Sequence, residues 1–270
     1  MAGELKAPET GADAERHAAE IAMHSAIAPR YRIRYGSDFA LLFHRHWNRA
    51  LLDLLPAAAG GPVLDAGCGT GILLPDLTER FSEVYGIDLS PDMLAAARLG
   101  SPHLQQLKVG VLEALEFPDR FFGVVVCRGS LHHAADRPKA FAEIHRVLRP
   151  GGFWLLSEPS DDFFAVRWAR ALLYRLSSHF DARDRPFRAR ELPAVFGEHG
   201  FELLALRRFG YAAYLLAGFT DVFPLLRWLP GRRRLTLGLI RFDSWLARFP
   251  LLSSAGFHLM ALGQKRGQVI

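Results

Sequence analysis

The chain has 270 residues, of which 50% are hydrophobic and 23% are charged, and its formal net charge is +5. This length suits one large domain or two small ones, and the composition excludes a wholly disordered chain. The two cysteines, Cys68 and Cys127, cannot form a disulfide framework and lack the spacing of a zinc site. A reducing compartment is therefore favoured, and no metal site is expected.

Neither export nor membrane insertion is indicated. Five acidic residues fall among the first 30, which is unlike a signal peptide. The longest apolar stretch, residues 211–229, is interrupted by Asp221, Pro224 and Arg227, so a transmembrane helix is not expected. We expect a cytoplasmic protein.

The first two thirds of the chain begin with helical patterns and then alternate between strands and helices. Helices are expected over residues 13–28 and 38–55, the second with apolar side chains at helical spacing. Ser90 followed by Pro91 is typical of a helix start. Short apolar runs predict strands at residues 63–66, 84–88, 104–109, 121–127 and 153–157. This alternation predicts a doubly wound, mostly parallel α/β sheet.

The remainder is mostly helical in pattern. Helices are expected over residues 161–178, 190–199 and 211–249, the last of these with breaks at Pro224 and at Pro230-Gly231, and strands are expected near 201–209 and 256–263. The predicted fold is a seven-stranded, Rossmann-like sheet with added helices. Its predicted parts are an N-terminal helical lid over 1–58, a cofactor-binding core over 59–160, a helical substrate cap over 161–250 that includes the sixth strand, and a last strand within 251–270.

A glycine-rich turn is expected directly after the first strand, in the sequence DAGCGTG at residues 65–71. Glycines there let the backbone approach a ligand closely, although an ordinary tight strand–helix turn is the simpler alternative. Asp88 is the last residue of the next expected strand, where a carboxylate can accept hydrogen bonds from both hydroxyls of a ribose. The glycines run G-x-G-x-G, which differs from the dinucleotide fingerprint G-x-G-x-x-G.

Three further motifs follow in order: GIDLSPDML at residues 86–94, LEFPD at 115–119 and LRPGG at 148–152. With the glycine turn, they resemble the successive motifs of class I S-adenosylmethionine-dependent methyltransferases. The branch resembled is the small-molecule group that includes ubiquinone and sterol C-methyltransferases. The resemblance is good over about residues 60–160 and loose elsewhere.

The resemblance implies S-adenosylmethionine as the cofactor and a role for each motif. Asp65 and the turn amides would face the methionine part, Asp88 would hold the ribose, and the residues after the second and third strands would lie beside the adenine. Val111 and Gly123 depart from the pattern, because the family usually has acids at both positions. The residues expected at the cofactor are Tyr31, Asp65, Gly67, Cys68, Gly69, Gly71, Asp88, Leu89, Met93, Leu112, Glu113 and Arg128.

Residues 127–133 follow the fourth strand, where the family places the transferring methyl group. Transfer from a sulfonium is an in-line displacement that depends mostly on positioning, but an oxygen nucleophile can also require a base. The candidate catalytic residues are His132, His133 and Glu158. As alternatives, the histidines could orient the loop, and Glu158 could be a solvated carboxylate at a strand end.

The C-terminal part is both apolar and basic. Residues 161–270 carry 17 basic and 9 acidic side chains, against 9 and 13 in residues 1–100. Arg183 and Arg185 could hold an acidic group of the substrate, and the basic surplus could contact an anionic membrane surface. A solvated surface is the alternative, and nucleic acid is disfavoured because no RNA-binding module is present.

We therefore expect methyl transfer to a small, fairly apolar molecule at oxygen, nitrogen or carbon, with residues 159–250 supplying most of the substrate pocket. Two other functions stay open on the sequence: a cofactor-binding scaffold without turnover, and a nicotinamide-dependent oxidoreductase.

Overall fold

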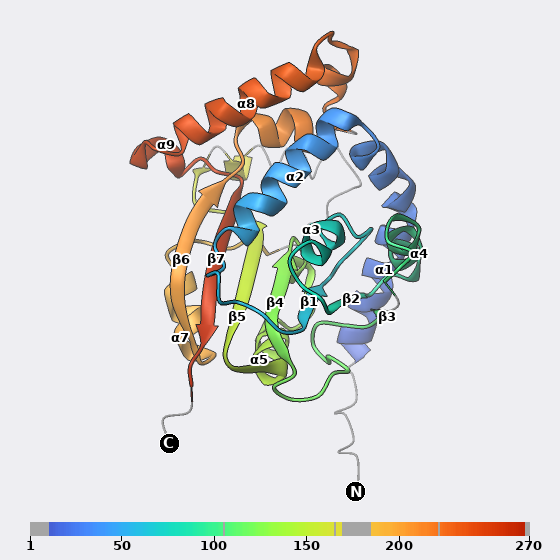
Figure 1. Cartoon of the computed structure of the whole chain (residues 1–270), viewed down its shortest axis with the longest axis vertical. Coiled ribbons are helices and arrows are strands. Elements are labelled where there is room, and N and C mark those ends of the chain that lie inside the picture. The colour runs from blue at the N-terminus through green and yellow to red at the C-terminus, as the bar shows by residue number, and fades with distance from the viewer. Residues whose placement is uncertain (1–10, 105, 165, 169–184, 221, 268–270) are drawn as a thin grey trace, which may run out of the picture.

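A computed structural model describes residues 11–104, 106–164, 166–168, 185–220 and 222–267. In this part of the chain one seven-stranded sheet has the order β3-β2-β1-β4-β5-β7-β6 (Figure 1). Its strands are β1 (Val63–Ala66), β2 (Val84–Asp88), β3 (Leu107–Val109), β4 (Phe122–Arg128), β5 (Leu148–Pro159), β6 (Phe201–Phe209) and β7 (His258–Lys265). Strands β1 to β5 are parallel, whereas β7 runs antiparallel to both β5 and β6. The predicted α/β fold class is confirmed.

The helices largely follow the predicted pattern. They are α1 (Gly11–Tyr35), α2 (Asp38–Leu52), α3 (Leu74–Thr78), α4 (Pro91–Gly100), α5 (Arg137–Val147), α7 (Leu192–Glu198), α8 (Arg232–Leu246), α9 (Pro250–Ser253) and the short turns η1 (Leu131–His133), η2 (Tyr214–Gly218) and η3 (Pro224–Trp228). Ser90 caps α4 as expected, because its side chain accepts a hydrogen bond from the amide of Met93. The expected helix over 211–249 is broken into η2, η3 and α8. Much of the helix expected over 161–178 lies outside the described residues.

Both faces of the sheet are covered, as its almost uninterrupted apolar strands require. Successive side chains of a strand point to opposite faces. Val63 and Val124 therefore join one core cluster with α2, α3 and α8, while Leu64 and Val125 join a second cluster with α5 and α7. The division into lid, core and cap stays a prediction, but β6 ties the expected cap to the core sheet through β7.

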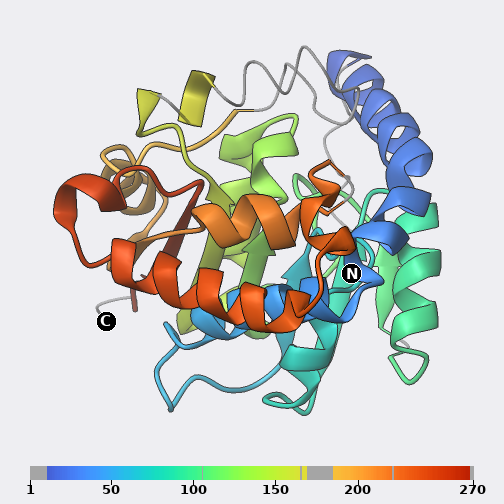
Figure 2. The same cartoon turned by 90° about the horizontal axis from the view of Figure 1, so that it is seen from above.

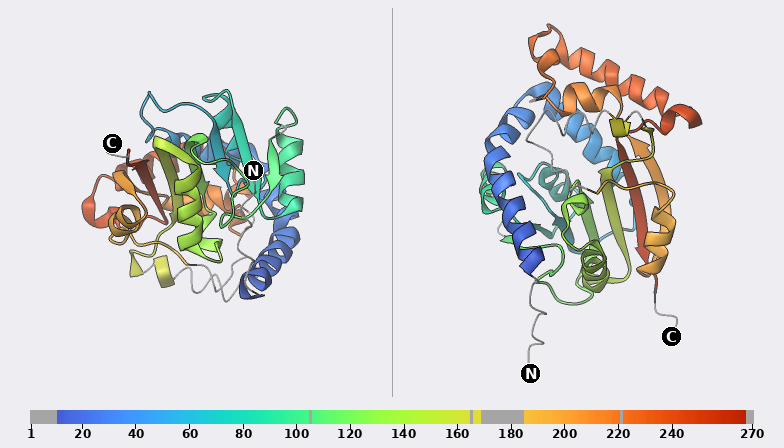
Figure 3. Two further views of the ribbon diagram at one scale, coloured as in Figure 1. Left: turned by 90° about the horizontal axis from the view of Figure 1, so that it is seen from below. Right: turned by 180° about the vertical axis from the view of Figure 1, so that it is seen from behind.

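Two long helices lie outside these layers. Helix α1 runs along the flank of the molecule and packs on α4, as the view from behind shows (Figure 3). Helix α8 crosses over α2 at the end of the molecule to which β4 and β5 point, and it forms the outermost layer there (Figures 1 and 2). The carboxyl ends of the parallel strands consequently lie between α1, α2 and the segment that leads into α8.

Candidate active site

The glycine turn after β1 adopts a backbone that favours glycine. Gly67, Gly69 and Gly71 have φ angles of +81°, +54° and +80°, in the left-handed region. A Cβ atom on Gly67 would overlap the side chain of Ser130, whereas one on Gly69 would meet no protein atom within 4 Å. Gly69 faces a cavity, so the turn leaves open space where a ligand can approach the backbone.

Asp88 lies at the end of β2, beside this turn. Its Oδ2 accepts a hydrogen bond of 2.7 Å from the amide of Gly69, and its Oδ1 accepts one of 2.9 Å from the amide of Ser90. Burial raises the pKa of Asp88, while these two amides favour the carboxylate and act in the opposite direction. The side chain is thus held in one orientation at the cavity edge.

A cavity of about 860 Å³, including its open mouth, lies over the carboxyl ends of β1, β2 and β4. Most residues expected at the cofactor line it: Tyr31, Gly67, Cys68, Gly69, Asp88, Leu89, Met93, Leu112, Glu113 and Arg128. A glycine turn, a fixed carboxylate and an apolar wall beside it fit a nucleoside with a flexible polar tail. We call this the cofactor cavity.

Asp65 and Gly71 were also expected at the cofactor, but neither is among the residues that line this cavity. Asp65 is buried, and burial raises its pKa to about 7, assisted by the charge of Asp88 and opposed by Arg128. Gly71 packs closely against Leu74 and Ala97. Gly71 therefore shapes the turn rather than facing the cavity.

The two departures from the family pattern have different settings. Val111 lines the cofactor cavity, where an acid is usual. Two residues later, Glu113 accepts a hydrogen bond of 3.1 Å from the amide of Asp136, and its carboxylate lies 3.6 Å from Nε2 of His17. A Cβ atom at Gly123 would overlap the carbonyl oxygen of Gly60, so no side chain fits there.

A second cavity adjoins the first, and its volume with the open mouth is about 1120 Å³. The two share five lining residues, namely His24, Tyr35, Arg128, Gly129 and His133. Aromatic side chains form much of the second wall, among them Trp47, Tyr214, Phe219, Phe223 and Phe257. We call this the acceptor cavity.

The expectation that residues 159–250 supply most of the substrate pocket stays a prediction, because part of that segment lies outside the described residues. Among the described residues, α1 and α2 contribute as many lining side chains as that segment does. Arg185 is exposed and does not line the cavity, and Arg183 lies outside the described residues. Within the described part of the chain, the arginines that line it are Arg34 and Arg128.

His132 and Glu158 form a buried pair at the acceptor cavity. Nδ1 of His132 lies 2.7 Å from Oε2 of Glu158. Oε1 of Glu158 accepts hydrogen bonds of 3.0 and 2.9 Å from the amides of Ser130 and Leu131. Glu158 has no exposed surface, so a solvated strand-end carboxylate is the wrong description. Burial raises its pKa to about 7, against the two amides.

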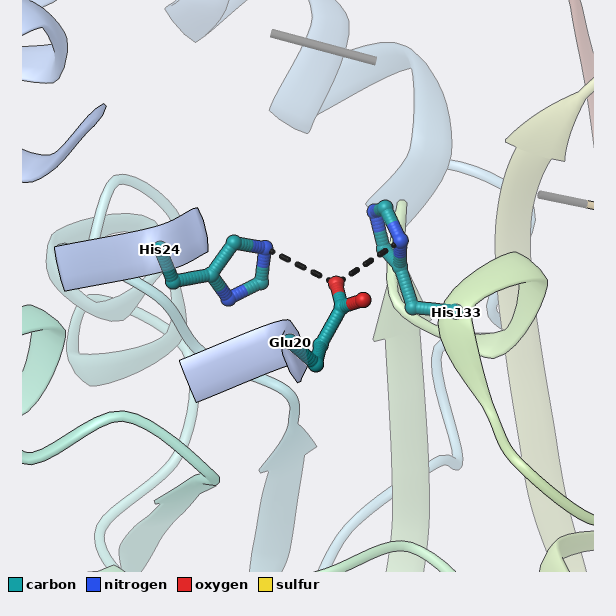
Figure 4. A group of neighbouring side chains, drawn as sticks. All are labelled: Glu20, His24 and His133. Carbon is teal, nitrogen blue, oxygen red and sulfur yellow. Dashed lines mark ion pairs between the residues drawn. The ribbon is translucent and has the colours of Figure 1, made fainter. Parts of the chain in front are cut away.

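His133 contacts a different carboxylate, that of Glu20 on α1. Nδ1 of His133 lies 2.9 Å from Oε1 of Glu20, and Nε2 of His24 lies 3.2 Å from the same oxygen (Figure 4). Neither Glu20 nor His24 was expected at the site from the sequence. The available signal was their spacing of four residues within an expected helix, which places them on one face.

A buried polar chain at the acceptor cavity was also missed. The phenol of Tyr214 lies 2.8 Å from Nε2 of His258, Nδ1 of His258 lies 3.4 Å from Oγ of Ser157, and Trp47 donates to that oxygen at 3.0 Å. These residues come from β5, β7, α2 and η2. Because the four residues come from separate elements, no local sequence pattern indicates that they form a hydrogen-bonded chain.

Comparison with known proteins places these features in a family. Residues 64–156 match the family described as methyltransferase domain. The chain is 34% identical over 196 residues to a ubiquinone biosynthesis O-methyltransferase of Pseudomonas aeruginosa, covering 62% of this chain and 82% of that protein. It is 39% identical over 141 residues to a demethylmenaquinone methyltransferase of Thermus thermophilus, covering 48% of this chain and 61% of that protein.

A solved structure agrees with the fold. A SAM-dependent methyltransferase of Thermotoga maritima superposes with a TM-score of 0.63 at 18% identity, covering 91% of this chain and 99% of that one. These likenesses favour neither the scaffold nor the oxidoreductase alternative. Within the described residues, no helix is long and apolar enough to cross a membrane. The chain therefore belongs to the class I S-adenosylmethionine-dependent small-molecule methyltransferases, and S-adenosylmethionine is its cofactor.

Proposed function

We propose that this enzyme methylates a phenolic oxygen of a small, apolar acceptor related to quinone precursors, with His132 as the base. The observation that carries the proposal is the pairing of His132 with buried Glu158 at an aromatic cavity that adjoins the cofactor cavity. The names of the two bacterial relatives, which concern menaquinone and ubiquinone, support an acceptor of this class.

Because Nδ1 of His132 contacts the carboxylate of Glu158, the two ring nitrogens of His132 have different roles. If Nδ1 carries the proton that is donated to Glu158, Nε2 is left as an acceptor. Nε2 can then take the phenol proton as the oxygen attacks. The resulting imidazolium is stabilised by the adjacent carboxylate, whose other oxygen stays bound to the amides of Ser130 and Leu131.

The bound cofactor supplies an electrophilic methyl group, and the chain has to align the acceptor with it and exclude water. Trp47, Phe219 and Phe223 offer flat apolar walls for an aromatic ring. Arg34 lies between the rings of Tyr31 and Phe219, with its Cζ 4.7 and 4.5 Å from their centroids. We assign to Arg34, in place of the cap arginines, any contact with an acidic group of the acceptor.

For the cofactor, we assign Asp88 to the ribose hydroxyls and the turn amides near Gly69 to the methionine part. Leu89, Met93 and Leu112 would contact the adenine, with Glu113 or the amide of Leu112 in place of the usual acid at Val111. The common lining of one cavity supports these assignments. Asp65 would act indirectly, through the charge that it places near Arg128.

Replacing His132 tests the proposed base. His132→Ala should lower turnover of a hydroquinone or catechol acceptor by about 10²–10⁴-fold, with cofactor affinity unchanged in calorimetry. His46→Ala, a half-buried histidine on α2 outside both cavities, is the matched control. A loss below about tenfold for His132→Ala, or methylation only of amines, would contradict the proposal.

We also propose that α8 docks the enzyme on an anionic membrane surface, from which an apolar acceptor can enter. Leu235 and Phe242 lie seven residues apart on α8 and are 43% and 45% exposed, and Phe249, which is 41% exposed, follows shortly after the helix ends at Leu246. Arg234, Arg241 and Arg248 repeat beside them and are exposed as well. The opposite face of α8 is buried through Thr236, Ile240 and Asp243. An apolar stripe flanked by arginines is typical of a helix that lies in a lipid interface.

The position of this surface relative to the acceptor cavity supports the same proposal. Val222 and Phe223 line the cavity, and η3 begins at the next residue, Pro224. On η3, Leu225 is 59% exposed and Trp228 is 83% exposed. The apolar surface therefore begins only two residues after the cavity wall.

A further inference from the structure

Three side chains that meet where the two cavities join form a potential metal-binding set. Glu20 and His24 lie one turn apart on α1, and His133 belongs to η1, which follows β4 (Figure 4). One ligand atom from each, an oxygen and two imidazole nitrogens, lies within 4.8 Å of the other two. Glu20 is buried, and both histidines are only partly exposed.

The distances from the Glu20 oxygen to the two imidazole nitrogens agree with a coordination shell. At metal–ligand distances of about 2.1 Å, neighbouring donors lie about 3.0 Å apart in an octahedral shell and about 3.4 Å apart in a tetrahedral one. Oε1 of Glu20 lies 2.9 Å from His133 and 3.2 Å from His24. Two imidazoles with one carboxylate suit zinc and the neighbouring first-row divalent ions.

The charge around the set also favours a cation. Glu20 lines the cofactor cavity. Asp88 and Glu113 line the same cavity. When the imidazoles are neutral, the cavity wall therefore carries several carboxylates, and Arg128 is the arginine that lines it among the described residues.

We propose that Glu20, His24 and His133 bind one divalent transition-metal ion, which fastens α1 to η1 over the cofactor cavity. The ion would bridge two segments that are more than 100 residues apart in the chain. Binding to the folded state alone would stabilise this closed arrangement by an amount that grows with the logarithm of the metal concentration once that concentration exceeds the dissociation constant. The proposal does not depend on the identity of the methyl acceptor.

Zinc titration of the chelator-treated protein tests the site directly. Calorimetry should give one Zn²⁺ per chain, and Glu20→Gln, His24→Ala and His133→Ala should each weaken binding at least about tenfold. His103→Ala, an exposed histidine after α4, should bind zinc like the wild type. Hydrogen exchange of residues 11–35 should slow when zinc is added to the wild type and stay unchanged in Glu20→Gln.

Folding and turnover are separated from metal binding in this design. Glu20→Gln keeps the shape of the side chain, and its circular dichroism and thermal transition should match those of the metal-free wild type. His132→Ala should bind zinc normally even though it is expected to lose turnover. Two results would show that the cluster is only an ion-pair network. One is equal zinc affinity in the three ligand variants and the wild type, and the other is a rate of hydrogen exchange in α1 that does not change when zinc is added.

Discussion

Glu158 combines a structural and an electrostatic role at the end of β5. Its two oxygens hold the backbone of Ser130 and Leu131 and the ring of His132, so the loop after β4 is built around one buried carboxylate. Such a group is costly to bury unless its hydrogen bonds are satisfied. We therefore expect both the activity and the stability of the protein to depend on pH.

The first consequence concerns activity. Burial raises the pKa of Glu158 to about 7, so the His132–Glu158 pair should lose a proton near neutral pH. Because the base must be unprotonated, kcat/KM should rise about tenfold per pH unit below about pH 7 and level off above it. A pH–rate profile measures this. Glu158→Gln should lower the plateau and displace the inflection, and an unchanged profile would contradict the assignment.

The second consequence concerns stability. The pKa of Glu158 rises from 4.5 to about 7 on folding, so the native state binds more protons between these values. The contribution of Glu158 to the free energy of unfolding should therefore fall as pH rises through this window. Denaturant unfolding of the wild type and Glu158→Gln at several pH values should show the difference shrinking on acidification. A pH-independent difference would disagree.

Asp88 allows a test of the cofactor assignment. Asp88→Ala removes a charged acceptor for two hydroxyls, which should weaken S-adenosylhomocysteine binding by roughly 2–4 kcal/mol in calorimetry. Part of this loss would come from the amides of Gly69 and Ser90, which Asp88 also holds. Asp88→Asn keeps an oxygen for one amide and should lose less. Wild-type affinity in a folded Asp88→Ala variant would remove the ribose assignment.

Which site residues could be predicted depended on how local their signals are. Gly69 lies just after β1 and Asp88 is the last residue of β2, and because the two strands are adjacent and parallel, the strand order implies that these residues are close together. Glu20 and His24 reach the site only because α1 packs along the flank of the sheet, which no local pattern indicates. The same holds for His258, which β7 carries back to β5.

Among the elements, strand positions were the most predictable, because apolar runs between turn residues mark them. Helix ends were harder to place. The helix expected to end at residue 28 continues to Tyr35 through Pro29, although proline disfavours a helix interior. The helix packs against the rest of the protein on both sides of this proline, where Ile27 and Arg34 are buried. The prolines at 224 and 230 predicted where the segment over 211–249 is interrupted. The sequence did not predict that this segment forms the short turns η2 and η3.

Asp243 joins α8 to the segment that begins the acceptor cavity wall. Its carboxylate accepts hydrogen bonds from the amides of Tyr211, Ala212 and Ala213 at 3.0–3.3 Å. Asp243→Ala should lower the free energy of unfolding by roughly 2–4 kcal/mol, because it leaves these amides without their partner. Chemical denaturation measures this loss.

Glu202→Ala serves as the control for Asp243→Ala. Glu202 is an exposed acid on β6, so its replacement should change stability by no more than about 0.5 kcal/mol. Asp243→Asn retains one acceptor oxygen and should fall between the two. If Asp243→Ala is as stable as the control, the carboxylate does not hold this segment.

For the whole molecule, the proposed lipid surface makes a measurable prediction. The protein should sediment with vesicles of phosphatidylcholine containing phosphatidylglycerol, and added salt should weaken binding. Phe242→Ser with Trp245→Ser should reduce vesicle binding about tenfold or more, since both rings are nearly half exposed. The fold should be unaffected.

A matched variant distinguishes binding through this surface from nonspecific hydrophobic binding to vesicles. Leu99 on α4 is 86% exposed but lies outside η3 and α8, so Leu99→Ser should bind vesicles like the wild type. Substituting glutamine at Arg234, Arg241 and Arg248 should reduce binding to anionic vesicles more than to neutral ones. Equal loss in Leu99→Ser and the double variant, or no sedimentation of the wild type, would rule out α8 as the docking surface.

The order of β7 and β6 in the sheet affects how the nascent chain can fold. Strand β7 is inserted between β5 and β6, although it is synthesised after both. Until residues 258–265 emerge from the ribosome, β5 and β6 each keep an edge that β7 will later pair. Open edges of this kind invite pairing with other chains. The parallel strands β1 to β5 can thus pair during translation, whereas β6 can join the sheet only after β7 has been synthesised. We expect the nascent chain to be most prone to aggregation, and most dependent on chaperones, before β7 pairs.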